Sequence, residues 1–567
     1  MNKYMMINGE QVAFTDEKNV LDVVRKAGID LPTFCYYSEL SVYGACRMCI
    51  VEDSNGNIMT SCSTPPKHGM EIRTHTPRLQ KHRKIILKLL LASHCRECTT
   101  CSKSGSCRLQ DLANRFGIKE IRFDKSEKAY KDEFPIDDSS PAIVRNPNKC
   151  IHCGDCVRMC SEKQNVGAID FTQRGYELRV STAFDMPIAE TECVNCGQCA
   201  AVCPTGAIVV KNNTSEAWDA IYDENTRVIA QVAPAVRVAL GEEFSIPSGQ
   251  NVMPLIAAAM RKLGFDEIYD TSFGADLTVI EETGEFAEKL AKGEKLPLFT
   301  SCCPAWVKYA ENRHPDIMHQ VSTCKSPQQM FGSVIKEYFK DKSAADGKKS
   351  FVVSIMPCTA KKAEAKRPEF NHDGIDDVDL VLTTQELANM IYEAGISFEK
   401  LEPEALDMPF GMFSGAGLIF GVTGGVTEAV VRKIAEEKTH NAINNIRFCG
   451  ARGMEGVKEF EFPLGDRMLR IAVVSGLKNA DDLIRKLKSG EVHYDFIEVM
   501  ACPGGCINGA GQPYGQMLER ESRAKGLYAA DKQAKIRHSD ANPILEPIYN
   551  TLLAGRTHEL LHVHYHS

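Results

Sequence analysis

The chain has 567 residues, of which 43% are hydrophobic and 25% charged, and this composition predicts a globular protein of several domains because one core does not grow to such a size. The formal net charge of −8 argues against general nucleic-acid binding, and no apolar run approaches the roughly 20 residues that cross a bilayer. The first residues lack a basic stretch followed by an apolar one, so we expect no secretory signal, a cytoplasmic location and no membrane contact. Cysteine is the unusual component: 16 of the 23 precede residue 204, mostly in CxxC steps that indicate metal binding rather than disulfides.

Residues 1–78 contain two short strand patterns, KYMMI and EQVAF, a helical stretch, NVLDVVRKAG, and a cysteine loop. Cys35, Cys46, Cys49 and Cys62 follow the spacing C-x10-C-x2-C-x12-C, which is close to the plant-type pattern for a 2Fe-2S cluster. The segment resembles a β-grasp ferredoxin domain, with a zinc knuckle as the alternative.

Residues 79–125 begin with a basic helical stretch that leads to His94, Cys98, Cys101 and Cys107. Three cysteines and a histidine also suit structural zinc. Their position between two iron–sulfur segments favours a 4Fe-4S cluster with one imidazole ligand. The stretch carries a basic cluster that could steer an acidic electron carrier or be an ordinary solvated helix face, namely Arg73, Arg78, Lys81, Arg83, Lys84 and Lys88.

Residues 126–212 carry the two-cluster bacterial ferredoxin motif, in which the fourth cysteine of each run binds the other cluster. We therefore expect one 4Fe-4S cluster on Cys150, Cys153, Cys156 and Cys203. The second cluster is expected on Cys193, Cys196, Cys199 and Cys160. Ser161 replaces the proline that usually follows the first run, and this departure spares every ligand.

Residues 213–567 alternate apolar strand-like runs with helical stretches, which predicts a large α/β domain. The runs RVIAQVAPAVR, LPLFTSCC, SFVVSIMPC, DLVLTT, RIAVVSG and FIEVMAC each indicate a buried strand. Reactive residues follow four of them, at Ala233-Pro234, Cys302-Cys303, Cys358 and Cys502. Ligands bind at the carboxyl ends of strands in open α/β sheets, so a site is expected there.

Three segments of this domain together resemble the FeFe (iron-only) hydrogenases, specifically the clostridial type with accessory-cluster domains before the catalytic domain. They are TSCCPAW around Cys303, MPCTAKKAE around Cys358, and MACPGGC from Met500 to Cys506. The resemblance covers nearly the whole chain. It implies reversible conversion of protons and electrons to H2, with electrons exchanged through the N-terminal clusters with ferredoxin or flavodoxin.

The resemblance also implies a catalytic H-cluster. Its 4Fe-4S cube would be held by Cys303, Cys358, Cys502 and Cys506, the last of which bridges to a two-iron subcluster with CO, cyanide and a bridging azadithiolate. Separate maturation proteins would supply that subcluster. Contacts to it would come from Lys361, Ala233, Pro234, Gln328, Met356 and Met500. An ammonium group such as that of Lys361 can donate to cyanide in a dry pocket.

A proton route is implied by the same resemblance, through Cys302, Glu282, Ser322 and Glu285. Glu282, Glu285 and Lys289 stand at helical positions i, i+3 and i+7 and so share one face. The outermost residue is usually arginine in the family and is Lys289 here. Without the cysteine motifs a solvated helix face would be the ordinary reading of these charges.

Four cysteines remain without a cluster role. Cys95 and Cys449 are expected to be buried as small hydrophobic residues. Cys324 is expected to line the site, and Cys302, which precedes a Pro304 that could open a helix, is expected to have a lowered thiol pKa.

Two further patterns are set aside. His558-Glu-Leu-Leu-His562 matches the HExxH pattern of zinc proteases, but it lies near the end of the sequence, where the family has similar residues. The glycine-rich stretch from Gly415 to Gly425 contains no lysine of the kind found in phosphate-binding loops. Close backbone packing around a cofactor is the better explanation of these glycines. Two other functional classes stay open: a non-catalytic electron-transfer or H2-sensing subunit, and a subunit of an NADH-linked bifurcating complex whose nucleotide site lies on partners.

Overall fold

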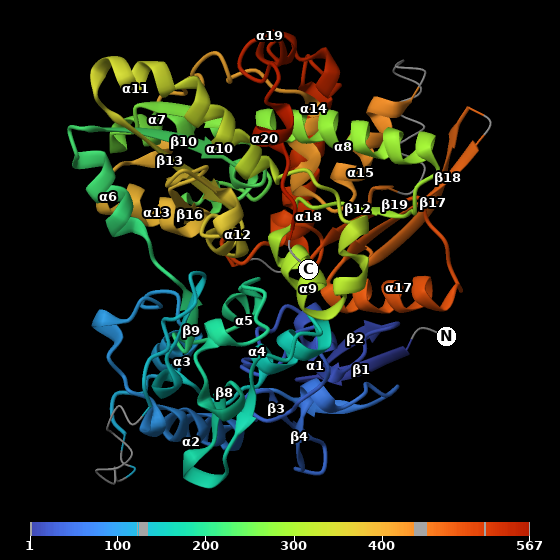
Figure 1. The fold of residues 1–567 in the computed structure, drawn as a ribbon. Coiled ribbons are helices and arrows are strands. Elements are labelled where there is room, and N and C mark those ends of the chain that lie inside the picture. The colour runs from blue at the N-terminus through green and yellow to red at the C-terminus, as the bar shows by residue number, and fades with distance from the viewer. Residues whose placement is uncertain are drawn as a thin grey trace.

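The computed structural model describes residues 3–121, 123, 134–435, 451–465, 467–514 and 517–565. It has a smaller lobe built from the first two hundred residues and a larger lobe built from the rest, which meet along the side of the larger lobe where α9 lies (Figure 1). Among the described helices, none combines the length and the apolar character that crossing a bilayer would need.

A five-stranded sheet of order β2-β1-β5-β3-β4 opens the smaller lobe. Strand β1 pairs parallel with β5 and antiparallel with β2, and helix α1 covers the sheet with its four buried apolar side chains. This is the β-grasp arrangement that the sequence predicted. The bounds are β1 Lys3–Ile7, β2 Glu10–Phe14, α1 Val20–Lys26, β3 Ile50–Asp53, β4 Ile58–Thr60 and β5 Glu71–Arg73.

Helices α2 and α3 follow, and then two small hairpin-like sheets carry the double cysteine motif. Helix α2 begins with Thr76 as N-cap and Pro77 at its first turn, which suits a residue without a backbone N–H. The bounds are α2 Pro77–Ser93, α3 Arg108–Arg115, β6 Ile143–Arg145, α4 Asp155–Arg158, β7 Asp170–Thr172, β8 Arg179–Ser181, α5 Gln198–Ala201 and β9 Ile208–Val210.

The larger lobe contains two separate four-stranded sheets. The first has the order β11-β10-β13-β16 and is entirely parallel. The second has the order β12-β19-β18-β17, with β17 antiparallel at its edge. The bounds are β10 Thr226–Val232, β11 Glu267–Asp270, β12 Leu298–Phe299, β13 Lys349–Met356, β16 Leu380–Thr383, β17 Val457–Leu464, β18 Arg467–Ser475 and β19 Phe496–Met500. All six predicted runs form strands, although LPLFTSCC contributes only two residues.

Helices cover both sheets, and α8 lies against α10, α14 and α15 (Figure 1). Helix α8 buries its first two turns completely and ends at Gly293, whose positive φ of 65° closes the helix. The bounds are α6 Thr214–Tyr222, α7 Met253–Leu263, α8 Ser272–Lys292, α9 Pro304–Arg313, α10 Pro327–Tyr338, α11 Lys340–Asp346, α12 Ala360–Glu364, α13 Thr384–Glu393, α14 Gly415–Leu418, α15 Gly425–Ile434, α17 Leu477–Ser489, α18 Met517–Gln533, α19 Leu545–Asn550 and α20 Thr557–Leu561; a small hairpin joins β14 Asn371–His372 to β15 Ile375–Asp376.

Candidate active site

A cavity of about 600 Å³ lies where the carboxyl ends of strands from both sheets converge. The first sheet supplies Ala233 and Pro234 directly after β10, and Met356 at the end of β13. The second sheet supplies Met500, the last residue of β19. The lining contains ten residues that the sequence singled out, namely Ala233, Pro234, Cys302, Cys303, Gln328, Met356, Cys358, Lys361, Met500 and Cys506.

The sequence missed several residues that also line this cavity, among them Thr271, Ala275 and Phe420. Gly421 lines it too, as expected for a glycine segment packed around a cofactor. A side chain at Gly421 would approach the Cβ of Ala235 to 3.1 Å, and one at Gly417 would overlap the carbonyl oxygen of Ser272 at 2.4 Å. These glycines therefore allow α14 to approach the cavity wall closely.

Three of the four cysteines predicted to hold the cube line this cavity, namely Cys303, Cys358 and Cys506, and Cys502 lies next to them without lining it. Cys303 is the N-cap of α9, and Pro304 opens that helix as predicted. Burial, followed by the neighbouring thiols of Cys358, Cys303 and Cys506, raises the pKa of Cys502 well above its usual value. Thiols that are crowded and dry in this way become stable thiolates only when metal ions neutralise them, so the quartet fits an iron–sulfur cube.

Two polar side chains point toward the same cavity. The Oε1 atom of Gln328 is buried and has no hydrogen-bond partner among the described residues, so it is free for a bound group. Lys361 Nζ donates to Glu364 at 2.8 Å and to the carbonyl oxygen of Cys302 at 3.2 Å, which leaves one of its three protons for the cavity. An ammonium and an amide beside a metal site suit anionic ligands such as cyanide.

The predicted proton-relay residues form a line from the cavity to the surface. Ser322 Oγ donates to Glu285 Oε2 at 2.8 Å, and Lys289 Nζ lies 3.7 Å from Glu285 Oε1. Glu282 is completely buried, and its carboxyl group lies beside the Ser322 hydroxyl, the Ser301 backbone N–H and Cys302.

Burial dominates the acid–base properties at the inner end of this line. It raises the pKa of Glu282 to about 8, helped by the charges of Glu285 and Glu498. The pKa of the Cys302 thiol is likewise raised well above its usual value, first by burial and then by Glu282. The expectation of a lowered thiol pKa at Cys302 was therefore wrong, because the loss of hydration and a nearby carboxylate outweigh the helix start at Pro304.

The accessory cysteines form separate groups in the smaller lobe, and all of them are buried or half-buried except Cys98, which is exposed. A pocket of about 490 Å³ is lined by Cys150, Cys153, Cys156 and Cys203, the four residues predicted to share one cluster. Cys160, Cys193 and Cys196 raise the pKa of Cys199 after burial does, which places the second predicted quartet together.

His94 faces a pocket of about 280 Å³ together with Cys98, Cys101 and Cys107. Its Nδ1 accepts from the backbone N–H of Arg96 at 3.1 Å, while its Nε2 is buried without a hydrogen-bond partner among the described residues. Burial lowers the pKa of His94 to about 4, so the ring is neutral and Nε2 is available as a metal ligand.

Two side chains connect the cluster sites to one another. Arg158 Nη2 donates to the carbonyl oxygen of Cys35 at 3.1 Å and so joins the first cysteine loop to the Cys150 group. Gln198 Nε2 donates to the sulfur of Cys502 at 3.2 Å and to Asn508 O at 3.0 Å. Because Gln198 lies between Cys196 and Cys199 in the chain, it joins the second cysteine group of the dicluster motif directly to Cys502.

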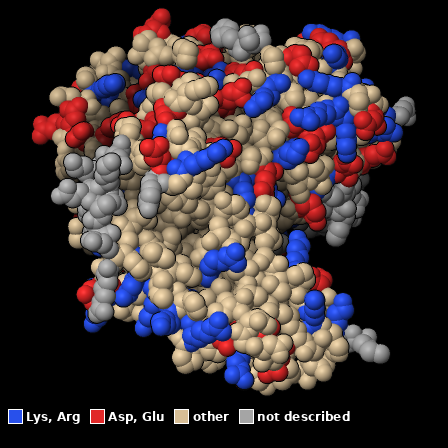
Figure 2. All heavy atoms as spheres, turned by 90° about the horizontal axis from the view of Figure 1, so that it is seen from below, with Lys and Arg blue, Asp and Glu red and all other residues tan. Residues whose placement is uncertain are grey.

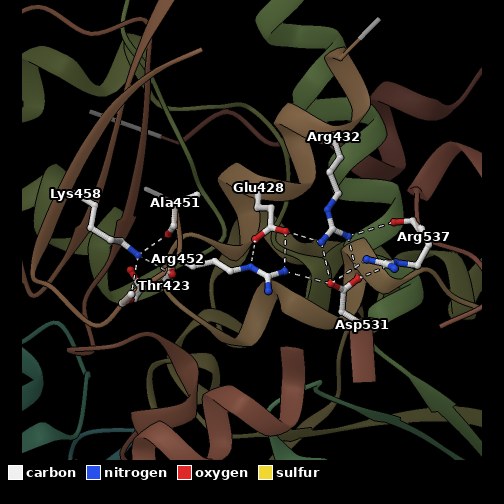
Figure 3. A network of polar contacts seen from close by, with 9 residues as sticks. Thr423, Glu428, Arg432, Ala451, Arg452, Lys458, Asp531 and Arg537 are labelled. Atoms are coloured by element: carbon white, nitrogen blue, oxygen red, sulfur yellow. Dashed lines mark hydrogen bonds and ion pairs between the residues drawn. The ribbon is translucent and has the colours of Figure 1, made fainter. Parts of the chain in front are cut away.

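A buried ionic network joins α15, which follows the glycine-rich stretch from Gly415 to Gly425, to helix α18 (Figure 3). Arg432 on α15 pairs with Glu428 at 2.5 Å and with Asp531 of α18 at 2.9 Å, and Arg452 pairs with Glu428 at 2.8 Å. Lys458 donates to the carbonyl oxygens of Thr423 and Ala451 at 2.9 and 2.7 Å. The network thus supports the cavity wall near Gly421 from behind.

Several expectations outside the site need correction. Cys95 is only half-buried and lines the His94 pocket, rather than being a buried core residue. Cys324 is fully buried in the core beside Ser322 and is absent from the cavity lining. Arg83 is also buried, and its guanidinium donates to three backbone carbonyls around the first cysteine loop. It is therefore not part of the exposed basic cluster. Cys449 lies outside the described residues.

The HExxH pattern has no zinc-protease geometry in the structure. Glu559 is exposed and forms an ion pair with Arg556 at 2.8 Å, while the rings of His558 and His562 stack 4.9 Å apart.

Family models match most of the chain. One described as "Iron only hydrogenase large subunit, C-terminal domain" covers residues 226–510, and one described as "Iron hydrogenase small subunit" covers 517–567. A 2Fe-2S iron-sulfur cluster binding domain matches 4–77, a 4Fe-4S dicluster domain matches 149–207, and an iron-sulfur binding region of NADH-ubiquinone oxidoreductase G matches 83–122. These matches favour iron–sulfur clusters over the zinc alternatives at both N-terminal motifs.

Similar proteins span the full length. The NADP-reducing hydrogenase subunit HndD of Solidesulfovibrio fructosivorans is 43% identical over 99% of this chain and 98% of its own. Iron hydrogenase 1 of Clostridium pasteurianum is 35% identical over 99% of this chain and 100% of its own. A solved structure of a variant of the FeFe-hydrogenase HydA1 from Chlamydomonas reinhardtii matches with a TM-score of 0.54 at 36% identity, and the match covers 63% of this chain and 99% of that one.

Proposed function

The chain belongs to the iron-only hydrogenase family and is an oxidoreductase acting on hydrogen, with accessory iron–sulfur domains, and from this premise we propose how its residues divide the reaction 2 H⁺ + 2 e⁻ ⇌ H2. The observation that carries the proposal is the cavity between the two sheets, which is lined by three of the four cube cysteines, by Gln328 with its free oxygen and by Lys361. The catalytic and binding roles below are our assignments.

We assign the 4Fe-4S cube to Cys303, Cys358, Cys502 and Cys506, which would hold it, and Cys506 would also hold the two-iron unit. When bound, that unit, with its CO, cyanide and azadithiolate ligands, supplies the metal chemistry that forms or splits H2. Lys361, Gln328 and the backbone after β10 would hold it by hydrogen bonds, while Met356 and Met500 keep water out of the cavity.

Proton transfer is assigned to the line of side chains from Lys289 to Cys302. At neutral pH the raised pKa keeps Glu282 protonated, so it can give a proton to Cys302 and regain one through Ser322. During H2 formation Ser322 Oγ gives its proton to Glu282 while it takes one from Glu285 Oε2, which lies 2.8 Å away, so its own charge does not change; H2 oxidation reverses both transfers. Cys302 stays neutral between transfers, which suits a relay in a dry pocket.

For the accessory clusters we propose one 2Fe-2S cluster on the first cysteine loop, one 4Fe-4S cluster ligated by His94, and two in the dicluster domain. The contacts of Arg158 and Gln198 support an electron route from the first loop through the dicluster domain to the catalytic cube. The high thiol content also favours a reducing, cytoplasmic location.

The electron carrier is proposed to be a ferredoxin or flavodoxin that docks on α2. This helix contains no acidic residue, and Lys81 and Lys84 are exposed beside Ile85 and Leu89, which are 39% and 51% exposed. Figure 2 shows the underside of the smaller lobe, where blue basic side chains are spread over a largely uncharged surface. A basic and apolar face suits an acidic protein partner.

Reversing the charges of Lys81, Lys84 and Lys88 to Glu should lower the low-salt rate with ferredoxin by ~10-fold or more, and the loss should shrink as salt is added. Lys340→Glu is the matched control, because this exposed lysine lies on α11 at the opposite end of the molecule (Figure 1). Turnover with a small artificial donor should stay unchanged in both variants. An unaltered ferredoxin rate at low salt would remove α2 as the docking face.

A second candidate assembly is favoured by the similarity to an NADP-reducing hydrogenase subunit. In that case this chain would be the hydrogen-converting subunit, and the nucleotide would bind on a partner. Purification under gentle conditions distinguishes the two: a ferredoxin-linked enzyme reacts alone, whereas a complex co-purifies with partner chains and reduces nucleotide only with them.

Infrared spectroscopy of protein matured by separate maturation proteins tests the main proposal. We expect CO and cyanide bands together with H2 turnover, and an iron content that rises from about 18 to about 20 atoms per chain on maturation. Matured protein without these bands would refute the catalytic assignment. Stoichiometric zinc at the His94 group would refute its assignment alone.

A further inference from the structure

The C-terminal segment after α20 lies directly beside the proton-relay loop. The backbone N–H of Val563 donates to Thr323 O at 2.7 Å, and that of Lys325 donates to Leu561 O at 2.8 Å. These bonds form a bridge between Cys324 and His562 and fix the His562 ring against Thr323. A segment distant in the sequence is thereby tied to the outer half of the relay.

The ring of His562 makes one polar contact through each nitrogen. Its Nδ1 lies 2.9 Å from Thr323 Oγ1, and its Nε2 lies 3.0 Å from Glu281 Oε2. Thr323 Oγ1 in turn donates to Glu285 Oε2 at 3.4 Å, and the Thr323 backbone N–H donates to the same oxygen at 3.0 Å. Glu285 therefore has two polar neighbours that lead outward, Lys289 on its own helix and His562 through Thr323.

Two exposed imidazoles pack beside His562. The His558 ring stacks on that of His562 with centroids 4.9 Å apart and an angle of 8°, and it lies 5.5 Å from the ring of His564. His558 and His564 are exposed, whereas only 11% of the His562 side chain is exposed. His562 therefore lies between these exposed rings and the half-buried Thr323.

The titratable and charged groups around His562 come from three elements and the relay loop. They are Glu281, Glu285 and Lys289 of α8, Tyr549 of α19, Cys324 of the loop, and His558 and His564 of its own segment. Glu281 also accepts from the Tyr549 hydroxyl, so its carboxylate is held toward His562. A ring with Thr323 Oγ1 at one nitrogen and a carboxylate at the other can donate from both, which is the bonding of an imidazolium.

The two outward neighbours of Glu285 differ in chemistry. A lysine ammonium has a reference pKa of about 10.4 and gives up its proton rarely at neutral pH, whereas imidazole exchanges protons readily there. Lys289 Nζ lies 3.7 Å from Glu285 Oε1, where its charge can attract and orient the carboxylate. The imidazole of His562, one hydroxyl away from Glu285, adds a side chain of the type that commonly carries protons.

We propose that His562, loaded from solvent at Nε2 beside the Glu281 carboxylate, is a second proton route into the relay, reaching Glu285 through the Thr323 hydroxyl. The proton on His562 Nδ1 passes to Thr323 Oγ1 while the hydroxyl proton passes to Glu285 Oε2. The imidazolium becomes neutral, the carboxylate becomes a carboxylic acid, and Thr323 is unchanged. A solvent proton then restores the imidazolium, and H2 oxidation runs the same steps in reverse. This inference rests on the proposed function of the relay.

The test compares matured enzyme in a Lys289→Met background, where the other outward route is removed. With an artificial electron donor, this parent should retain turnover with an acid-dependent limb in its pH profile. Adding His562→Gln, which keeps both hydrogen-bonding positions but cannot titrate, should remove that limb and lower the rate by ~10-fold or more. Thr323→Val should act like His562→Gln, and Thr323→Ser should restore the parental profile because it restores the hydroxyl.

Two further readouts separate proton transfer from simple support of the fold. Imidazole added in solution should raise the rate of the His562→Ala variant, which a purely structural role would not do. In protein made without maturation, infrared pH-difference spectra should show a carboxyl band that changes as His562 titrates and that is lost in both His562→Gln and Glu285→Gln.

The outcomes are separable. If the unaltered matured enzyme makes no H2 and lacks CO and cyanide bands, the proposed function fails; if Lys289→Met keeps those bands but makes no H2, the second route is wrong. If the parent is active and the His562→Gln and Thr323→Val variants keep its rate and its pH profile, the second route is wrong. If His562→Gln loses its clusters, the Thr323→Val and Thr323→Ser pair decides the question by the same criteria.

Discussion

Replacing Glu282 with glutamine removes a buried proton-exchanging group while keeping its shape and the neutral charge that we expect it to have at pH 7. The side chain is fully buried, and burial is the main reason that its pKa rises from 4.5 to about 8. One unit below that pKa, roughly one molecule in ten is ionised. Glu282→Gln should therefore fold normally yet lose ~100-fold or more of its H2 turnover, because an amide does not relay protons.

The size of the shift also predicts how stability depends on pH. A rise from 4.5 to about 8 corresponds to roughly 4–5 kcal/mol for ionising Glu282 inside the fold, at about 1.4 kcal/mol per unit. Because the folded-state pKa lies above the unfolded one, the folded protein binds more protons, and stability present below pH 4.5 is lost as the pH rises through 8. Glu282→Gln should thus resist heat better than the parent at alkaline pH and show little advantage at acid pH.

Infrared pH-difference spectroscopy follows the carboxyl group itself. The parent should lose a protonated carboxyl band near pH 8, and Glu282→Gln should lack that band. Glu285→Gln is the matched control: since Glu285 raises the pKa of Glu282, its removal should move the loss of the band to lower pH. A parent with no such band at neutral pH, or a Glu282→Gln enzyme with parental turnover, would refute the reasoning.

Three other changes test separate parts of the structure. Cys302→Ser should keep the iron content and the CO and cyanide bands but lose most H2 turnover, because a hydroxyl is far less acidic than a thiol. Cys302→Asp should retain some activity, and Cys303→Ser should damage the cluster. Parental turnover in Cys302→Ser would contradict the proposed role of the thiol. Gln198→Leu removes the N–H that is donated to the sulfur of Cys502, the proposed cube ligand. A hydrogen bond of ~1 kcal/mol, converted at ~59 mV per tenfold change in the redox equilibrium constant, predicts that the cube potential falls by roughly 40 mV in an EPR redox titration. An unshifted potential would exclude this role. Arg432→Met leaves two buried carboxylates with fewer partners and should cost about 3 kcal/mol, read as a lower midpoint of thermal unfolding, and an unchanged midpoint would show that the network does not stabilise the fold.

The cluster motifs and the helical face of the relay were predictable because they are local in the chain. A CxxC step brings two sulfurs within reach of one cluster whatever the rest of the fold does, and Glu282, Glu285 and Lys289 share a face in any α-helix. The strands were also predictable, since their apolar runs are continuous. These signals placed the predicted contact residues Ala233, Gln328 and Met500 in one domain, and the structure brings them to one cavity.

Contacts between distant segments were decided only by the tertiary structure. Gln198 and Cys502 are 304 residues apart and Thr323 and His562 are 239 apart, and no local pattern links either pair. The division of the strands into two sheets, with the cavity between them, has the same origin, because strand order depends on pairing and not on composition. The pKa of the Cys302 thiol also depends on the tertiary structure. The sequence shows that Cys302 precedes a helix start, but only the surrounding fold buries the thiol next to Glu282, and this burial raises the pKa that helix geometry alone would lower.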